Sequence, residues 1–196
     1  MKALHATAAA GLTLVLASGS AAAEPRLFEF DPEHVSIVFD ISHIGYQQQM
    51  GMFLEGGGSF RFDEETGDLS DLVFTVDAAS IFTNHEARDK HVRSPDFLDA
   101  EAHREIRFTM VSAERRSETG GIVHGELTFR GMTLPQSVNV TLNRIGPYPW
   151  GDTYVIGVSA DAVLDRSAFG STYGLEDGLV GGEVHLRFEI EAIRQE

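Results

Sequence analysis

Residues 184–191 read V-H-L-R-F-E-I-E, a strict alternation of apolar with polar or charged side chains. A period of two places successive side chains on opposite faces of an extended chain, so it predicts a β-strand with one buried face. Residues 35–41 show a similar apolar face. Further segments with an apolar face lie at residues 52–62, 72–76, 106–110, 123–129, 138–142 and 154–164. The chain is therefore expected to consist mainly of strands.

Turn sequences separate these segments. They lie at residues 63–67, 118–121, 130–133 and 146–152. Short turns favour antiparallel neighbours, and closing a sheet on itself removes its exposed edges. We therefore predict an all-β fold, an antiparallel up-and-down barrel of about eight strands with one short helix near residues 84–93. A barrel of that size either fills itself with side chains or holds one small ligand. Three consecutive glycines at 56–58 suggest a bulge or bend.

The helix is predicted from its boundary signals. Asn84 is a suitable N-cap, and Ser94 precedes Pro95, which disfavours the helical conformation at the residue before it. The spacing i,i+4 predicts solvated pairs of Glu86 with Lys90 and of Asp89 with Arg93. These pairs leave three side chains without a local partner, which either tie the helix to the strands or border a site. They are His85, Arg88 and His91.

Residues 1–23 have the pattern of a secretory signal peptide, with Lys2 before an apolar run and an A-x-A site that predicts cleavage after Ala23. Residues 24–196 then form one exported domain, with no segment suited to stable membrane insertion. The chain has no cysteine, which excludes disulfides and thiolate chemistry. Its net charge of −15 argues against nucleic acid as a partner.

Three segments resemble the YceI family of periplasmic polyisoprenoid-binding proteins. They are T-N-H-E-A-R-D-K-H-V-R-S-P-D-F-L-D at 83–99, H-V-S-I-V-F-D-I-S-H-I-G-Y at 34–46 and P-W-G at 149–151. The resemblance implies a lipocalin-like barrel in the periplasm that binds a polyisoprenoid, such as a prenyl quinone, as ligand and needs no cofactor. It also covers the turn at 165–170, where Arg166 is expected to be a structural anchor rather than a ligand contact.

A ligand-holding barrel predicts a wall of inward-facing apolar side chains. Many of them are phenylalanines, whose flat rings suit a branched unsaturated chain. The predicted wall consists of Ile37, Phe39, Ile41, Phe53, Phe60, Phe62, Phe74, Val76, Phe108, Met110, Leu127, Phe129, Val138, Val140, Ile156, Val158, Leu186 and Phe188. Polar residues at the mouth would select a headgroup. The candidates are His43, Tyr46, His85, Arg88 and His91. The stiff turn with Tyr148 and Trp150 is expected to close one end of the barrel.

Catalytic and metal-binding patterns are weak. Residues 85–89 begin like an H-E-x-x-H zinc helix, but Asp89 stands where the second histidine is required. No nucleophile elbow and no phosphate-binding loop occur. We therefore expect a binding protein that is not an enzyme and has no metal site. A homodimer is one option for its assembly. Two alternatives remain: an enzyme that uses His85, Asp89 and His91 on an isoprenoid lipid, and a stress-related periplasmic partner protein whose barrel is filled by its own side chains.

Overall fold

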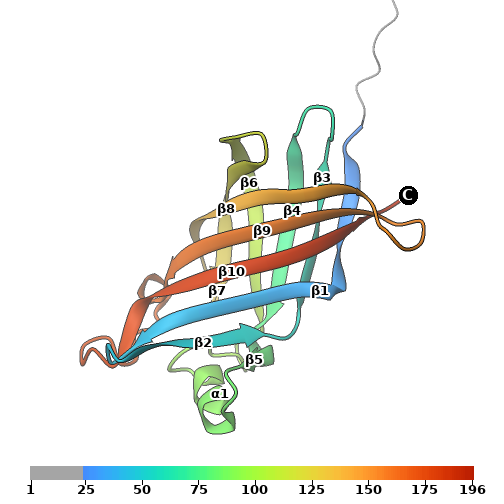
Figure 1. The fold of residues 1–196 in the computed structure, drawn as a ribbon. Coiled ribbons are helices and arrows are strands. Elements are labelled where there is room, and N and C mark those ends of the chain that lie inside the picture. Colours follow the sequence, from blue (N-terminus) through green and yellow to red (C-terminus); the bar gives the residue numbers. More distant parts are fainter. Residues whose placement is uncertain (1–23) are drawn as a thin grey trace, which may run out of the picture.

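The computed structural model describes residues 24–196, so the signal peptide expected at residues 1–23 lies outside the described residues. The described chain forms an antiparallel β-barrel with one α-helix (Figure 1). The strands are β1 (Arg26–His43), β2 (Gln47–Phe53), β3 (Gly56–Phe62), β4 (Leu69–Asp77), β5 (Ile81–Phe82), β6 (Glu105–Arg115), β7 (Gly120–Phe129), β8 (Met132–Pro147), β9 (Tyr154–Asp165) and β10 (Val180–Arg194). The helix is α1 (Glu86–Arg93), and the short 3-10 turns are η1 (Ala78–Ser80) and η2 (Arg166–Phe169).

Ten strands make eight positions around the barrel, because two positions are occupied by broken strands. The long strand β1 pairs with β3 along its first half and with β2 along its second half. Next to them, β4 pairs with β3 and β5 pairs with β2. Pairing of β1 with β10 closes the ring. The predicted eight-stranded up-and-down barrel is confirmed.

The two ends of the barrel differ. One end, called here the helix end, holds the turn at 44–46, the segment 78–104 with α1, the turn at 130–131 and the connection 166–179. The other, called the turn end, holds the turns at 63–68, 116–119 and 148–153. In Figure 1, α1 lies below the barrel and the β3–β4 and β6–β7 turns project from the opposite end. Polar helix residues can therefore reach one end of the lumen only.

The glycine run at the start of β3 is not itself the bend that was expected. Gly56, Gly57 and Gly58 pair in regular register with β4, and the register shift comes later, between Ser59 and Arg61. Gly58 is required for another reason, since a Cβ atom there would overlap the carbonyl oxygen of Val73. The absence of a side chain at Gly58 allows the β3 and β4 backbones to approach closely.

Helix α1 begins one residue later than its predicted cap. His85 is the N-cap residue, and its Nδ1 atom accepts a hydrogen bond from the backbone N–H of Arg88 at 3.2 Å. Asn84 instead adopts a left-handed φ of 61°, which turns the chain from β5 into the helix. The prediction of Asn84 as the cap is wrong, because Asn84 belongs to the turn before the helix and the cap position falls on the next residue, His85.

The predicted ion pairs on the helix are also wrong. Neither Glu86 with Lys90 nor Asp89 with Arg93 is an ion pair among residues 24–196. Asp89 is buried and accepts hydrogen bonds from Thr83, whereas Arg93 donates to the carbonyl oxygens of Ala79 and Ile81 at 3.4 Å each. Tertiary contacts to the strands have replaced the local pairs that an isolated helix would form.

Candidate functional site

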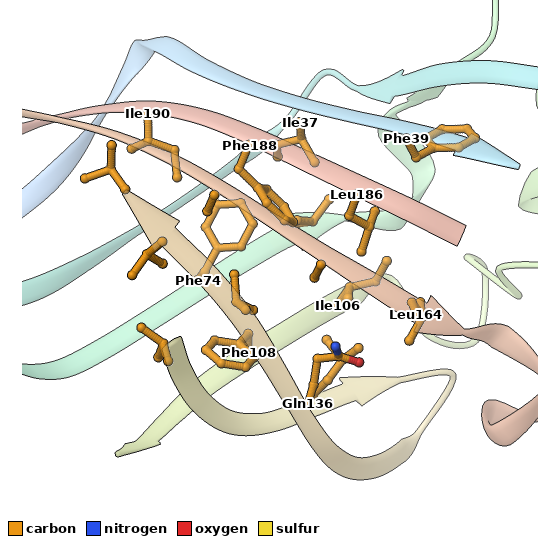
Figure 2. A pocket seen from close by; sticks show the side chains of 18 of the residues that line it. Ile37, Phe39, Phe74, Ile106, Phe108, Gln136, Leu164, Leu186, Phe188 and Ile190 are labelled. Atoms are coloured by element: carbon orange, nitrogen blue, oxygen red, sulfur yellow. The ribbon is translucent and has the colours of Figure 1, made fainter. Parts of the chain in front are cut away.

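The barrel encloses a cavity of about 960 Å³. This volume is at the upper end of the range of about 300–1,000 Å³ for small-molecule sites. Its wall carries side chains from around the ring, and Figure 2 shows Phe74, Phe108 and Phe188 projecting into the interior. Residues of both the helix end and the turn end border it. The protein's own side chains therefore do not fill the barrel.

Every predicted wall residue except Met110 borders this cavity. Met110 lies at the register shift between β6 and β7 and packs against the core cluster that contains Phe108. Whether the wall residues contact a ligand stays a prediction. Their positions nevertheless show that the period of two identified the inner face correctly for β1, β3, β4 and β7 to β10.

The wall also contains residues that the sequence analysis did not select. Several lie on the predicted inner face of their strands, and the alternation already contained the signal for them. They include Ile106, Leu142, Leu164, Val184 and Ile190. Others come from the segment around α1, where a period of two gives no information. These are Val92, Phe97 and Leu98. Gln136 on β8 was missed because a polar residue was not expected on an apolar wall.

The structure divides the five predicted mouth residues. His43, Arg88 and His91 border the cavity at the helix end. Tyr46 does not border it, and it is 90% exposed in the β1–β2 turn. His85 is exposed and caps α1. The structure therefore does not place Tyr46 or His85 among the residues that border the cavity, and whether either contacts a ligand stays a prediction.

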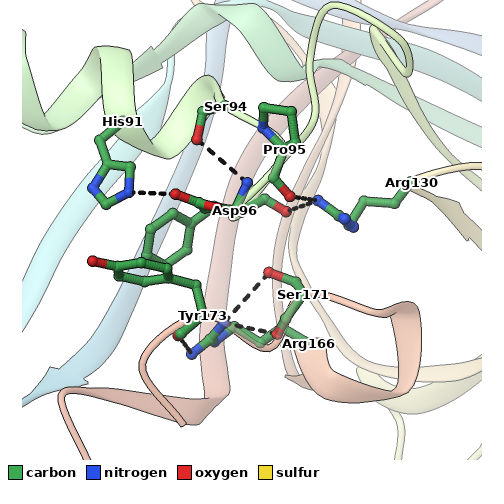
Figure 3. Close-up of polar contacts among 9 residues, drawn as sticks. His91, Ser94, Pro95, Asp96, Arg130, Arg166, Ser171 and Tyr173 are labelled. Atoms are coloured by element: carbon green, nitrogen blue, oxygen red, sulfur yellow. Dashed lines mark hydrogen bonds and ion pairs between the residues drawn. The ribbon is translucent and has the colours of Figure 1, made fainter. Parts of the chain in front are cut away.

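An aromatic cluster forms part of the helix-end mouth. The imidazole of His91 meets the rings of Phe97 and Tyr173 edge to face, with centroids 5.1 and 4.9 Å apart. His91 Nε2 also lies 2.9 Å from Asp96 Oδ2, as Figure 3 shows. The two aromatic contacts and the contact of Nε2 with Asp96 together fix the orientation of the imidazole.

Arg166 lies in the β9–β10 connection at the helix-end mouth and is only 3% exposed. Its guanidinium donates hydrogen bonds to the carbonyl oxygens of Ser171, Tyr173, Val180 and Gly181 at 2.7–3.1 Å. Figure 3 shows the bonds to Ser171 and Tyr173. Burial lowers the pKa of Arg166, and the nearby charge of Asp165 partly opposes this effect. Because four backbone carbonyls depend on one side chain, Arg166 organises the β9–β10 connection, as expected for a structural anchor.

Thr83 connects Arg88 to the buried Asp89. Arg88 Nε donates to Thr83 Oγ1 at 2.8 Å, and one Nη donates to the Thr83 carbonyl at 2.7 Å. The Thr83 hydroxyl and its backbone N–H in turn donate to Asp89 Oδ1. Both helix residues are thus held by the segment that follows β5. The Asp89 carboxylate is committed to this network, and among the described residues it makes no hydrogen bond to the side chain of His85 or His91.

The turn end is bordered by acidic side chains and one bridging arginine. Arg115 donates to the carbonyl oxygens of Thr66, Ser117 and Glu118, which joins the β3–β4 turn to the β6–β7 turn. Trp150 does not take part, because it is 76% exposed and does not border the cavity. The expectation that Tyr148 and Trp150 close the barrel is wrong. Their rings contact each other, with centroids 5.8 Å apart, and neither residue borders the cavity.

A separate polar cluster lies on the outer surface, where β1 bulges against β10. Asp31, His34 and Glu191 place three potential metal-ligand atoms within 4.8 Å of one another, a group that the sequence analysis did not single out. His34 Nδ1 is already bonded to Asp31 Oδ2 at 2.7 Å. This bond raises the pKa of His34 and lowers the pKa of Asp31. The cluster is accounted for as a surface ion pair.

Comparison with known proteins decides the family. The model of the YceI-like domain matches residues 28–192, which is almost the whole described barrel. The chain belongs to the YceI-like family. Its relatives include the UPF0312 protein of Serratia proteamaculans, 34% identical over 94% of this chain and 95% of the relative. The UPF0312 protein of Pseudomonas syringae pv. tomato is 35% identical over 81% of this chain and 82% of the relative.

Solved structures show the same YceI-like fold. Burkholderia cenocepacia BcnA has a TM-score of 0.74 at 19% identity, covering 83% of this chain and 98% of BcnA. The Campylobacter jejuni YceI protein has a TM-score of 0.69 at 22% identity, covering 96% and 100%. A domain from Saccharophagus degradans described as polyisoprenoid-binding has a TM-score of 0.61 at 12% identity, covering 88% and 100%. In residues 24–196, no helix has the length and apolar character needed to cross a membrane.

The segments that carried the YceI resemblance gather mainly at the helix end. Residues 83–99 form α1 and the loop after it, and residues 34–46 include the part of β1 that leads into the turn at 44–46. Both segments contribute cavity-lining residues, among them Phe39, His43 and His91. The family pattern therefore coincides with the polar mouth of the lumen.

Proposed function

We propose that this YceI-like protein binds a polyisoprenoid, or a similar long-chain amphiphile such as a prenyl quinone, inside the barrel. It sequesters or carries the lipid in the periplasm after export, makes or breaks no bond, and needs no cofactor. The observation that carries the proposal is the cavity of about 960 Å³ with an apolar wall. The description of the Saccharophagus degradans domain as polyisoprenoid-binding agrees with it.

Hydrocarbon burial provides the affinity. Each buried methylene-sized group contributes about 0.8 kcal/mol, from which the cost of ordering the chain must be subtracted. Phe30, Phe74 and Phe188 pack with tilted or edge-to-face contacts, with centroids 5.4–5.6 Å apart, and leave space beside them. A prenyl tail has no hydrogen-bonding groups, so this wall can accept it without leaving polar atoms unpaired.

The alternatives have less support. A barrel filled by its own side chains is incompatible with the cavity. An acid–base mechanism requires catalytic groups that converge on one reacting atom. Here His85 caps α1, Asp89 binds Thr83 and His91 contacts Asp96, so the three proposed catalytic residues are engaged with separate partners.

Extraction of protein purified from its host tests the proposal directly. Native mass spectrometry should detect a bound lipid, and solvent extraction should release an isoprenoid. The intact mass of the apoprotein should correspond to a chain that begins at Glu24. A protein that is empty from its host and also takes up no prenyl lipid in vitro would contradict the proposal.

A pair of matched variants tests the lumen. Phe188→Asp places a carboxylate on the apolar wall, where it has no partner, and should abolish lipid retention. Val111→Asp adds the same charge at an exposed position on β6 and should leave retention unchanged. Equal retention in both variants, with both folded by circular dichroism, would mean that the lipid binds elsewhere.

A further inference from the structure

Gln136 is a polar side chain on the otherwise apolar wall of β8. Its neighbours on the inner face of that strand, Val138 and Val140, are hydrocarbon. Figure 2 shows the Gln136 amide among Ile106, Phe108 and Leu164. Other polar residues that border the cavity from strands, such as Ser42 and His43 on β1 and Gln49 on β2, lie at or near the strand ends, whereas Gln136 lies in line with the valines of β8. A half-buried amide in this setting requires an explanation.

The nitrogen of this amide has a structural role. Gln136 Nε2 donates to the carbonyl oxygens of Ser137 at 2.9 Å and of Val163 at 3.2 Å. The β8–β9 ladder begins at Asn139 opposite Asp161, so the Val163 carbonyl lies beyond its end. The side chain supplies a donor that the ladder does not. Both amide hydrogens are therefore used by the protein.

The oxygen of the amide has no hydrogen-bond donor among the described residues. Within residues 24–196, Gln136 Oε1 accepts no hydrogen bond from the protein. Two carbonyl oxygens beside the nitrogen fix which end of the amide is which, since a flipped amide would place oxygen against oxygen. Oε1 is not a buried unsatisfied atom, so it is at least partly accessible, and Gln136 borders the cavity. Opposite it on β7 stands Gly125, where the ring of Phe108 occupies the space that a side chain would take.

We infer that Gln136 Oε1 accepts a hydrogen bond from a hydroxyl group of the bound lipid. This inference rests on the proposed function and names its ligand class more closely: an isoprenoid with a hydrogen-bond donor on its head. A prenyl alcohol and a hydroxylated, reduced prenyl quinone have such a donor, whereas an ether, an oxidised quinone and a carboxylate present only acceptors to Oε1. Gln136 is then a specificity-determining residue.

The position of Gln136 also orients the ligand. Val163, to which it is bonded, lies three residues before Arg166 on the chain, or about 10 Å along an extended strand. The hydroxyl group is thus held on the helix-end side of the lumen, where Arg88 and His91 also border the cavity. The tail extends from there toward the turn end, along the wall that contains Phe60 and Phe62.

Geranylgeraniol and its methyl ether provide the test, because they share a tail and differ in the hydroxyl proton. The wild-type protein should bind the alcohol about three- to tenfold more tightly than the ether, the contribution of one hydrogen bond. In Gln136→Met this ratio should fall to about one. The volume-conserving control Leu164→Met, on the same part of the wall, should keep the wild-type ratio.

The ratio is measured within one protein, so a general loosening of the β8–β9 edge in Gln136→Met changes both affinities together. Equal wild-type affinities, or a ratio that Gln136→Met preserves, would overturn the inference and leave the proposed function standing. Binding of neither compound would overturn both. If Gln136→Met does not fold, carbon-13 labelling of the wild-type glutamine side chains decides: the Gln136 carbonyl resonance should shift with the alcohol and not with the ether, and any other result overturns the inference.

Discussion

The guanidinium of Arg166 lies over the ring of Phe97, with its Cζ atom 5.5 Å from the ring centroid. This contact joins the β9–β10 connection to the loop after α1. Arg130 in the β7–β8 turn reaches the same loop and donates to the carbonyl oxygens of Pro95 and Phe97 at 2.8 and 2.6 Å. Two arginines from different turns therefore hold the mouth of the lumen in place.

Loss of the Arg166 side chain should be severely destabilising. Arg166→Met leaves four backbone carbonyls without their donor, and the free energy of unfolding should fall by about 3 kcal/mol or more. Urea denaturation measures this value. The matched control is Arg187→Met, which removes an exposed ion pair with Glu189 and should change stability by about 0.5 kcal/mol or less. Similar losses in both variants would contradict the anchor role.

Asp89→Ala should release α1 from the barrel. The substitution leaves the hydroxyl and N–H of Thr83 without an acceptor in a buried site, which costs about 2 kcal/mol. Hydrogen exchange should accelerate for the amides of residues 86–93 and stay slow in β9 and β10. Glu86→Ala, on the first turn of the same helix, serves as the exposed control. Unchanged exchange in Asp89→Ala would show that other contacts hold the helix.

Neighbouring glycines in β3 should respond in opposite ways to alanine. A Cβ atom at position 58 overlaps the carbonyl oxygen of Val73, so Gly58→Ala should reduce the free energy of unfolding by about 1–3 kcal/mol. A Cβ atom at position 57 has no neighbour within 4 Å. Gly57→Ala should therefore be neutral or slightly stabilising. Thermal unfolding of the two variants compares them, and equal midpoints would contradict the close strand contact.

Asp77 should contribute to stability in a pH-dependent manner. Burial tends to raise its pKa, but the hydrogen bonds from Arg104 and from the backbone of Ala79 outweigh this effect and lower the pKa below its ordinary value of 3.8. The contribution is therefore complete above pH 3.8 and is lost as the pH falls through the lowered pKa. Urea denaturation of wild type and Asp77→Asn should give a stability difference that is constant near neutral pH and shrinks in acid. A difference that grows in acid would contradict this sign.

The alternation of apolar residues was sufficient to predict the barrel and most of its inner wall. Strand parity is set by backbone geometry, so Phe39 and Phe188 face inward wherever the strands lie in the ring. Residues of the helix end could not be placed in the same way. Asp89 has suitable local partners in the sequence, and its burial against Thr83 arises from tertiary packing that a helical spacing does not contain.

The positions of two exposed aromatic side chains were not predicted correctly, for a related reason. Trp150 and Tyr46 belong to turns, where no period indicates which way a side chain points. Gln136 differs from these two residues. The alternation along β8 places it on the inner face, but a polar residue was not expected on an apolar wall. The sequence alone does not reveal that the Val163 carbonyl, remote along the chain, satisfies the amide nitrogen.

The cavity is bordered at one extreme by the turn around Gly67 and at the other by the loop around Tyr173, so it spans the height of the barrel. A lumen of this shape selects the width of its ligand more strictly than the length. Prenyl lipids with successively longer tails should thus place the same segment of the tail inside the lumen and differ in the length of tail that extends out of it.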